Sequence, residues 1–148
     1  LRLYFTIKSP SRFLIISDST AFCGTPPGYY TLPNGETRHV TSDGQILTSG
    51  GRRCGSARPA LFGIRTLTEK LPMPFETALR MATLQPARKY GLASRKGSLA
   101  PGKDADFVLL GDDYQVLATY VAGRRVYDRS ESALLRSEFL TERLFTPA

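Results

Sequence analysis

An unbroken apolar run at residues 13–16 is the sequence feature that most constrains the fold of this chain. A strand with one face in water alternates apolar and polar residues, whereas a strand buried on both faces, as in a parallel sheet, is apolar throughout. The run ends in four polar residues, 17–20, and a loop rich in glycine and proline follows at residues 23–28. The pattern therefore predicts a buried strand whose end carries polar side chains.

Strand and helix patterns then follow one another along the rest of the chain. Short strands around two glycine-containing turns are predicted for residues 29–48, and a basic, glycine-rich loop for residues 49–55. The other predicted elements are a helix tail at 1–8, helices beginning after Ser56, at Pro74 and at Gln85-Pro86, strands at 106–110, 116–121 and 125–127, and an amphipathic helix at 130–145. This order indicates an α/β fold with a separate small sheet near its end.

Length and composition limit the class of protein. The chain has 148 residues, enough for one ordinary domain, and its apolar content of 41% argues against wholesale disorder. No apolar run approaches the roughly 18 residues that span a bilayer, and no signal-peptide pattern opens the chain. The chain opens on Leu1 within an apolar stretch, which suggests the C-terminal piece of a longer protein. We expect a cytoplasmic protein without a membrane partner.

The chain is basic, with a net charge of +7. Such a charge is compatible with nucleic acid or with an anionic substrate. The basic residues, however, are spread along the whole chain and are not interleaved with aromatic residues in the manner of an RNA-stacking surface. A solvated basic surface is the favoured interpretation, and no nucleic-acid partner is expected.

Few residues suit metal or redox chemistry. Cys23 and Cys54 are the only cysteines, and without a secretion signal they are expected to stay reduced. His39 is the only histidine, so the chain cannot build a multi-histidine metal centre by itself, and we interpret His39 as an exposed structural residue. Asp104 and Asp106 are interpreted as turn and strand-start groups rather than as paired acid–base carboxylates.

Asp18 is the candidate catalytic residue because it directly follows the predicted buried strand. In α/β barrels and open sheets, reactive groups gather at the C-terminal ends of the strands, and a partly desolvated carboxylate there can act as a general base. The alternative is that Asp18 caps the turn that follows it, as Asp commonly does. Spacing alone leaves both interpretations open.

A second candidate site is the segment Cys54, Gly55 and Ser56, which lies just before a predicted helix. Backbone amides and a hydroxyl at a helix N-terminus can hold an anion or sugar hydroxyls. The alternative is that Ser56 is a plain helix cap. The residue types alone do not decide between a binding role and a capping role.

Several motifs resemble those of the amidohydrolase superfamily. GSLAPGKDADFV at residues 97–108, continued by VLATYVAGRRVY at 116–127, resembles the closing segment of that superfamily, and ALRMATLQPAR at 78–88 is similar to the helix before it. Motifs at 17–21, 24–30 and 54–56 resemble, more narrowly, the N-acetylglucosamine-6-phosphate deacetylases. The resemblance runs from the first residue to about residue 128 and leaves the predicted final helix outside it.

The resemblance implies the C-terminal fragment of a (β/α)8 metal-dependent hydrolase barrel together with part of a small β-sandwich domain. The last strand–helix part of the barrel, with an inserted β-loop, would occupy residues 1–95. The C-terminal strands of the sandwich would occupy residues 96–128, and a helical tail residues 129–148.

The resemblance also implies a chemistry: hydrolysis of the acetamide of an amino-sugar phosphate, with the help of one or two divalent ions, zinc or iron. In that family the Asp after the eighth strand activates the attacking water and protonates the departing amine, and Asp18 occupies its position. Cys54, Gly55 and Ser56 stand where the family contacts the sugar, with Cys54 in place of a serine. The family's metal ligands lie on earlier strands, which this chain does not include.

The sequence therefore favours the C-terminal part of an amidohydrolase that is inactive alone, because a lone carboxylate lacks the Lewis acid that the reaction needs. The alternative is a truncated, non-catalytic module that binds a partner chain or an amino-sugar phosphate. A missing N-terminal half or a second copy of the chain is the expected protein partner, since a barrel strand without neighbours leaves unpaired edges.

Overall fold

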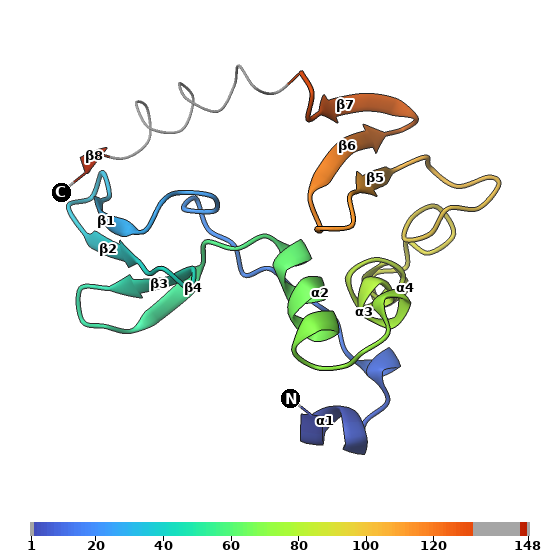
Figure 1. The fold of residues 1–148 in the computed structure, drawn as a ribbon, viewed down its shortest axis with the longest axis horizontal. Coiled ribbons are helices and arrows are strands. Elements are labelled where there is room, and N and C mark those ends of the chain that lie inside the picture. The colour runs from blue at the N-terminus through green and yellow to red at the C-terminus, as the bar shows by residue number, and fades with distance from the viewer. Residues whose placement is uncertain (1, 132–145, 148) are drawn as a thin grey trace. The chain divides into compact units, whose positions relative to one another are not determined.

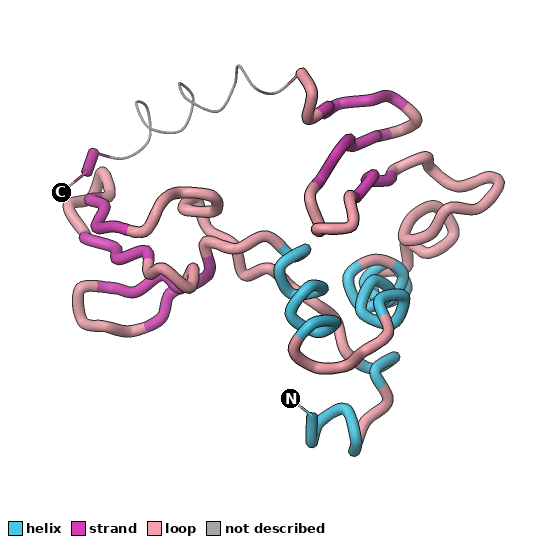
Figure 2. Tube along the Cα trace, viewed as in Figure 1, coloured by secondary structure: helices cyan, strands magenta, loops and turns pink. Residues whose placement is uncertain are grey.

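The computed structural model describes residues 2–131, 146 and 147, and the chain falls into two compact units. Unit 1 comprises Leu1–Ile16 and Leu61–Ser132, and unit 2 comprises Ser17–Ala60 and Ala133–Ala148. Figure 1 follows the chain through its elements. Figure 2 shows that the helices are concentrated in unit 1, whereas unit 2 consists mainly of strands and loops.

The helices of unit 1 are short. They are α1 (Arg2–Ile7), the 3-10 turn η1 (Pro10–Arg12), α2 (Ala60–Glu69), α3 (Phe75–Ala82) and α4 (Leu84–Lys89). The prediction of a helix tail at the start of the chain is confirmed, and so are the helices at Pro74 and around Pro86. Gly91 follows α4 at a φ of +72°, a left-handed conformation that ends helices and costs glycine little.

The core of unit 1 forms between α2 and α3. Ile64 and Leu67 of α2 and Ala78 and Met81 of α3 are buried together. On each helix the two residues are three positions apart, so they lie on one face, which is the spacing of an amphipathic helix. This packing, rather than the intrinsic helix propensity of such short segments, accounts for their stability.

The predicted strand at residues 13–16 is wrong, because these residues are extended but pair with no strand among the described residues. Their side chains nevertheless alternate. Phe13 and Ile15 pack against the helical core, while Leu14 and Ile16 are 38% and 78% exposed. The Phe13 N–H donates to the Pro10 carbonyl within the preceding turn, and the Ile15 N–H donates to the Met81 carbonyl of α3. A strand exists only with a neighbour to share its hydrogen bonds, and the described chain supplies none here.

A three-stranded antiparallel sheet completes unit 1. Its strands, in the order β5–β6–β7, are β5 (Phe107–Leu110), β6 (Val116–Val121) and β7 (Arg124–Asp128), which confirms the three predicted strands. Phe107 and Tyr120 face each other across β5 and β6, with stacked rings whose centroids lie 4.4 Å apart. Cross-strand aromatic pairs of this kind stabilise antiparallel sheets.

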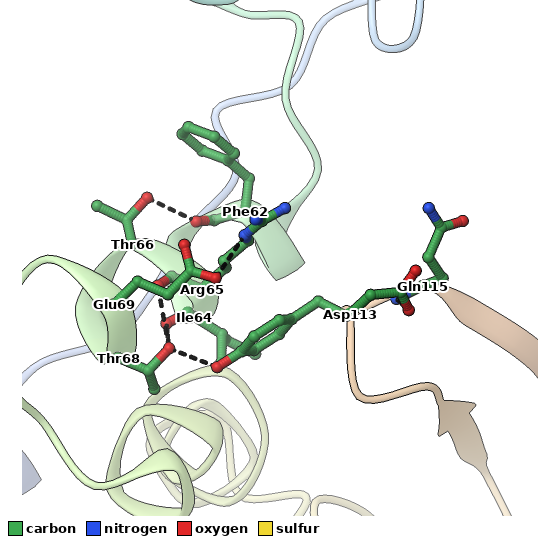
Figure 3. Close-up of polar contacts among 9 residues, drawn as sticks. Phe62, Ile64, Arg65, Thr66, Thr68, Glu69, Asp113 and Gln115 are labelled. Carbon is green, nitrogen blue, oxygen red and sulfur yellow. Dashed lines mark hydrogen bonds and ion pairs between the residues drawn. The ribbon is translucent and has the colours of Figure 1, made fainter.

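The turn between β5 and β6 joins this sheet to the helices through Tyr114. The Tyr114 hydroxyl lies 2.6 Å from the hydroxyl of Thr68 on α2. Figure 3 shows Thr68 together with Asp113 and Gln115, the sequence neighbours of Tyr114. The Arg65 guanidinium lies 5.9 Å from the centre of the Tyr114 ring, and the ring meets Phe75 of α3 edge-on. The predicted small sheet is thus a separate three-stranded sheet, and Tyr114 of its first turn contacts the α2–α3 pair.

Unit 2 is built around an antiparallel sheet in the strand order β4–β3–β2–β1–β8. The strands are β1 (Gly28–Thr31), β2 (Thr37–Val40), β3 (Gln45–Thr48), β4 (Arg53–Ser56) and β8 (Thr146–Pro147). Gly35 and Gly44 lie in the first two turns at φ values of +81° and +77°, so the two predicted glycine turns are confirmed. Phe22, Val40, Ile46 and Ala57 form the core of this unit.

The predicted loop at residues 49–55 is only partly correct, because Arg53–Ser56 form strand β4. This segment pairs with β3, with Leu47 opposite Arg53 and Gln45 opposite Ser56. The Arg53 guanidinium also donates to the side-chain oxygen of Gln45, at 2.7 Å. Glycine has a low strand propensity, but the available edge of β3 and this polar contact outweigh it.

The predicted amphipathic helix at 130–145 lies almost wholly outside the described residues. Thr146 and Pro147 are described, and they pair with Thr31 and Tyr30 at the outer edge of β1. Among the described residues, every helix is too short or too polar to cross a membrane.

Candidate functional site

Asp18, the candidate catalytic residue, is exposed and has a backbone conformation that is uncommon for residues with a side chain. Its φ is +49°, a left-handed conformation that Asp tolerates better than most residues. The Ser17 hydroxyl accepts a hydrogen bond from the Ser19 N–H, at 3.2 Å, and so closes a small turn around Asp18. Within the described part of the chain, the Asp18 carboxylate has no hydrogen-bond or ion-pair partner. The carboxylate is therefore exposed and unpaired within the described residues.

The backbone of Asp18 lies directly beside strand β4. The Ser56 N–H donates to the Asp18 carbonyl at 2.8 Å, and the Thr20 N–H donates to the Ser56 carbonyl at 3.1 Å. Ser19 and Ser56 thereby form a short parallel bridge. We call this contact between residues 18–20 and residues 55–56 the Asp18–Ser56 crossing. It brings the two sequence-predicted sites, which are more than thirty residues apart in the chain, into hydrogen-bond contact.

Glycine is required at position 55 for the crossing to form. Gly55 has a φ of +124°, which residues with side chains rarely adopt. A Cβ at this position would overlap the Thr20 methyl group and lie 3.2 Å from the Asp18 carbonyl oxygen. The absence of a side chain therefore permits both the backbone conformation and the close approach of the two segments.

Hydroxyl groups tie the crossing to the residues before α2. The Ser56 hydroxyl accepts from the Arg58 N–H at 2.9 Å, and the Ser19 hydroxyl donates to the Arg58 carbonyl at 2.7 Å. The expectation that Ser56 sits at a helix N-terminus is wrong, because α2 begins at Ala60 and the Ser56 amide is bonded to Asp18. The proline at position 59 and the turn made by Ser56 and Arg58 keep the helix from starting earlier.

Cys54 is turned toward the interior of unit 2. Its thiol lies 3.5 Å from the Ile46 carbonyl and packs against the core of the unit, and both it and Cys23 are free thiols. Of the three residues predicted to contact a substrate, Gly55 and Ser56 are those in contact with the Asp18 backbone. A contact of any of the three with a substrate stays a prediction.

The other singled-out residues lie in structural contacts. The His39 ring stacks on Tyr29 of the neighbouring strand, with centroids 4.4 Å apart, and is half-buried rather than exposed. Asp104 and Asp106 both form ion pairs with Lys96, which lies in the loop between α4 and β5. Hydrogen bonding from Lys96 lowers the pKa of Asp104, and the Ala122 N–H, then Lys96, lower that of Asp106.

Sequence reasoning missed two members of the site, Ser19 and Arg58. Their contact joins residues 39 positions apart, and no local pattern signals such a pair. The one available signal was Gly55, a glycine within a strand, which often marks a close approach of backbones.

The described residues do not supply a metal site. No group of three or more His, Cys, Asp or Glu side chains in the described part of the chain is placed to hold an ion. The described part of the chain therefore holds no ligand set that fits a divalent ion beside Asp18, the candidate acid–base residue.

Residues 32–126 match the amidohydrolase family, and the chain belongs to that family. Members of the family are generally metal-dependent. The chain is 36% identical over 122 residues to the N-acetylglucosamine-6-phosphate deacetylase of Vibrio furnissii, a match that covers 82% of this chain and 30% of that protein.

Solved structures give the same picture. The N-acetylglucosamine-6-phosphate deacetylase of Pasteurella multocida aligns with a TM-score of 0.74 at 28% identity, over 84% of this chain and 32% of that one. An Asp-to-Ala variant of the Mycobacterium smegmatis enzyme, in complex with N-acetyl-D-glucosamine-6-phosphate, aligns with a TM-score of 0.71 at 29% identity, over 84% of this chain and 33% of that one. The chain spans about a third of the length of these relatives.

Proposed function

We propose that this chain is the C-terminal part of an amidohydrolase that removes the acetyl group from N-acetylglucosamine-6-phosphate, with Asp18 as its acid–base residue. The observation that carries the proposal is the Asp18–Ser56 crossing, which holds the backbone of Asp18 against Ser56 and leaves the Asp18 side chain exposed. The relatives named above that match this chain are N-acetylglucosamine-6-phosphate deacetylases.

Asp18 would serve the reaction by moving one proton. As a general base, its carboxylate accepts a proton from the water that attacks the acetamide carbon, and as a general acid it returns this proton to the nitrogen as the C–N bond breaks. The products are acetate and the free amine of the sugar. The Asp18 side chain is available for this role, since no side chain or backbone group among the described residues already holds it.

Residues 13–16 support the proposal that the chain completes a barrel. Phe13 and Ile15 face the helices, and Leu14 and Ile16 face outward, as in a strand that would be buried on both faces once neighbours are present. We propose that these residues are the last barrel strand, that residues 1–95 hold the barrel part, that 96–128 hold the sandwich strands, and that 129–148 form a tail.

The same exposed residues favour a second candidate function, a non-catalytic module that binds a partner chain. Leu14 and Ile16 offer an exposed apolar edge that pairs with no strand in the described part of the chain, which is a ready surface for an added strand. This candidate predicts partner binding without hydrolysis of the sugar phosphate.

A hybrid chain tests the proposed function. The segment of the Vibrio furnissii deacetylase that precedes its match to this chain would be fused to residues 1–148, with zinc or iron supplied. We expect the hybrid to release acetate from N-acetylglucosamine-6-phosphate and the 148-residue chain alone to release none. A folded, metal-loaded hybrid without activity would contradict the proposal, and so would substantial activity of the chain alone.

A further inference from the structure

Arg58 touches both sides of the Asp18–Ser56 crossing, although nothing in the sequence motifs points to it. Its N–H donates to the Ser56 hydroxyl at 2.9 Å, and its carbonyl accepts from the Ser19 hydroxyl at 2.7 Å. Its side chain runs in another direction, where the guanidinium donates to the Ser42 carbonyl at 3.1 Å. One residue thus connects the β2–β3 turn with the residue that follows Asp18.

The β2–β3 turn is shaped to receive this side chain. Gly44 is buried at a φ of +77°, and a Cβ there would overlap Nε, Cγ and Cδ of Arg58. The Gly44 carbonyl also accepts from the Ala57 N–H at 2.9 Å, directly beside Arg58. Gly35 in the β1–β2 turn has nearly the same conformation, with a φ of +81°, but nothing lies within 4 Å of its Cβ position. The missing side chain at Gly44 therefore makes room for Arg58, whereas Gly35 serves the turn alone.

We propose that Arg58 is a positioning residue for Asp18, an inference that rests on the proposed function of Asp18. The guanidinium is anchored on the β2–β3 turn, and this anchor fixes the backbone of Arg58. The fixed backbone in turn holds the Ser19 hydroxyl, and with it the turn that carries the Asp18 carboxylate. An arginine suits this role because its planar group can lie along a backbone turn and still donate to a carbonyl.

Amide hydrogen exchange in the 148-residue chain tests the anchor without any activity. The amides to follow are those of Ser56 and Thr20, which make the two backbone hydrogen bonds of the crossing. In the Arg58→Ala and Gly44→Ala variants we expect these amides to exchange about three to ten times faster, the effect of losing one hydrogen bond of ordinary strength. Arg58→Lys keeps the aliphatic part and one donor, so it should restore most of the protection.

Gly35→Ala is the matched control, because both glycine variants carry the same backbone strain and only Gly44→Ala meets Arg58. Equal exchange at Ser56 and Thr20 in the Gly35→Ala and Gly44→Ala variants would contradict the proposal. So would unchanged exchange in Arg58→Ala.

The hybrid enzyme tests the link to Asp18. We expect Arg58→Ala to lower kcat about tenfold with little change in KM, and Ser19→Ala to do the same, because both release the turn around Asp18. If Arg58 acts through Ser19, the double variant loses no more than either single variant. Additive losses would contradict this route. An inactive unaltered hybrid would contradict the proposed function and any kinetic role of Arg58, whereas the exchange result would still decide whether Arg58 fixes the crossing.

Discussion

Residues 13–16 and residues 18–20 differ in whether their backbones pair with another segment of the chain. The first stretch is apolar and strand-like, yet it pairs with no strand in the described chain. The second is polar and loop-like, yet it forms a backbone bridge with Ser56. A backbone segment therefore pairs where a neighbouring segment is present and can come close, whatever the strand propensity of its residues. Gly55 supplies such a neighbour for residues 18–20, and the described residues supply none for residues 13–16.

The largest expected effect on stability comes from adding a side chain at Gly55, where two backbone segments approach closely. A Gly55→Ala variant places a methyl group against Thr20 and strains a φ of +124°, so it should destabilise unit 2 by about 2–4 kcal/mol. Urea denaturation would measure the loss. Gly51→Ala is the control, since Gly51 has a φ of +74° and an open Cβ position, and it should cost roughly 1–2 kcal/mol. Equal losses would show that the crossing needs no close approach.

The next effect separates the two faces of residues 13–16. Ile15 packs against the helical core, and its Cγ2 lies 3.1 Å from the position that a Cβ on Gly63 would occupy. Ile15→Ala should therefore cost about 2 kcal/mol of stability. Ile16 is 78% exposed, so Ile16→Ala should change the stability of the chain by less than about 0.5 kcal/mol.

The hybrid chain allows the Ile15 and Ile16 variants to be compared in the presence of the proposed barrel neighbours. If barrel neighbours cover Ile16 there, Ile16→Ala should become as costly as Ile15→Ala in thermal unfolding of the hybrid. An Ile16 variant that remains neutral in the hybrid would contradict the assignment of residues 13–16 as a barrel strand.

A smaller effect depends on pH and concerns unit 1 alone. The Lys96 hydrogen bond holds the pKa of Asp104 below its ordinary value of 3.8, and the Ala122 N–H, followed by Lys96, does the same for Asp106. These contacts stabilise the fold above that pH, and the stabilisation is lost as the pH falls through the lowered values. Hydrogen bonding to Asp106 raises the pKa of Lys96 above 10.5, so its contribution is lost only as the pH rises through that raised value. Urea midpoints measured from pH 5 downward should fall less steeply for Lys96→Gln than for the unaltered chain. Equal slopes would show that this ion-pair cluster does not contribute.

Much of the fold could be predicted from the sequence because local signals dominate it. The glycine turns at Gly35 and Gly44 and the helix after Pro74 follow from residues close together in the chain, and the structure contains them. Strand β4 was missed because its glycine argues against a strand, and pairing with the edge of β3 makes it one.

The candidate site was predictable only in part. Asp18 was singled out by its place after an apolar run, and Gly55 and Ser56 by their motif. That these residues meet depends on backbone hydrogen bonds between residues 18–20 and Ser56, and the proposed role of Arg58 depends on its contact with Ser19, 39 positions away. No spacing rule supplies such pairs. The expected start of α2 at Ser56 failed for the same reason, since Ser56 is bonded to Asp18 instead of capping a helix.

The most direct test of the central claim is the turnover of the hybrid enzyme with Asp18→Asn, measured together with its metal content. Asn keeps the size of the side chain but cannot accept and return a proton, so we predict that kcat falls at least about a hundredfold while the metal content is unchanged. Asp112→Asn, at another exposed aspartate, is the control and should leave kcat as it is. An Asp18→Asn hybrid that turns over at the unaltered rate would contradict the account.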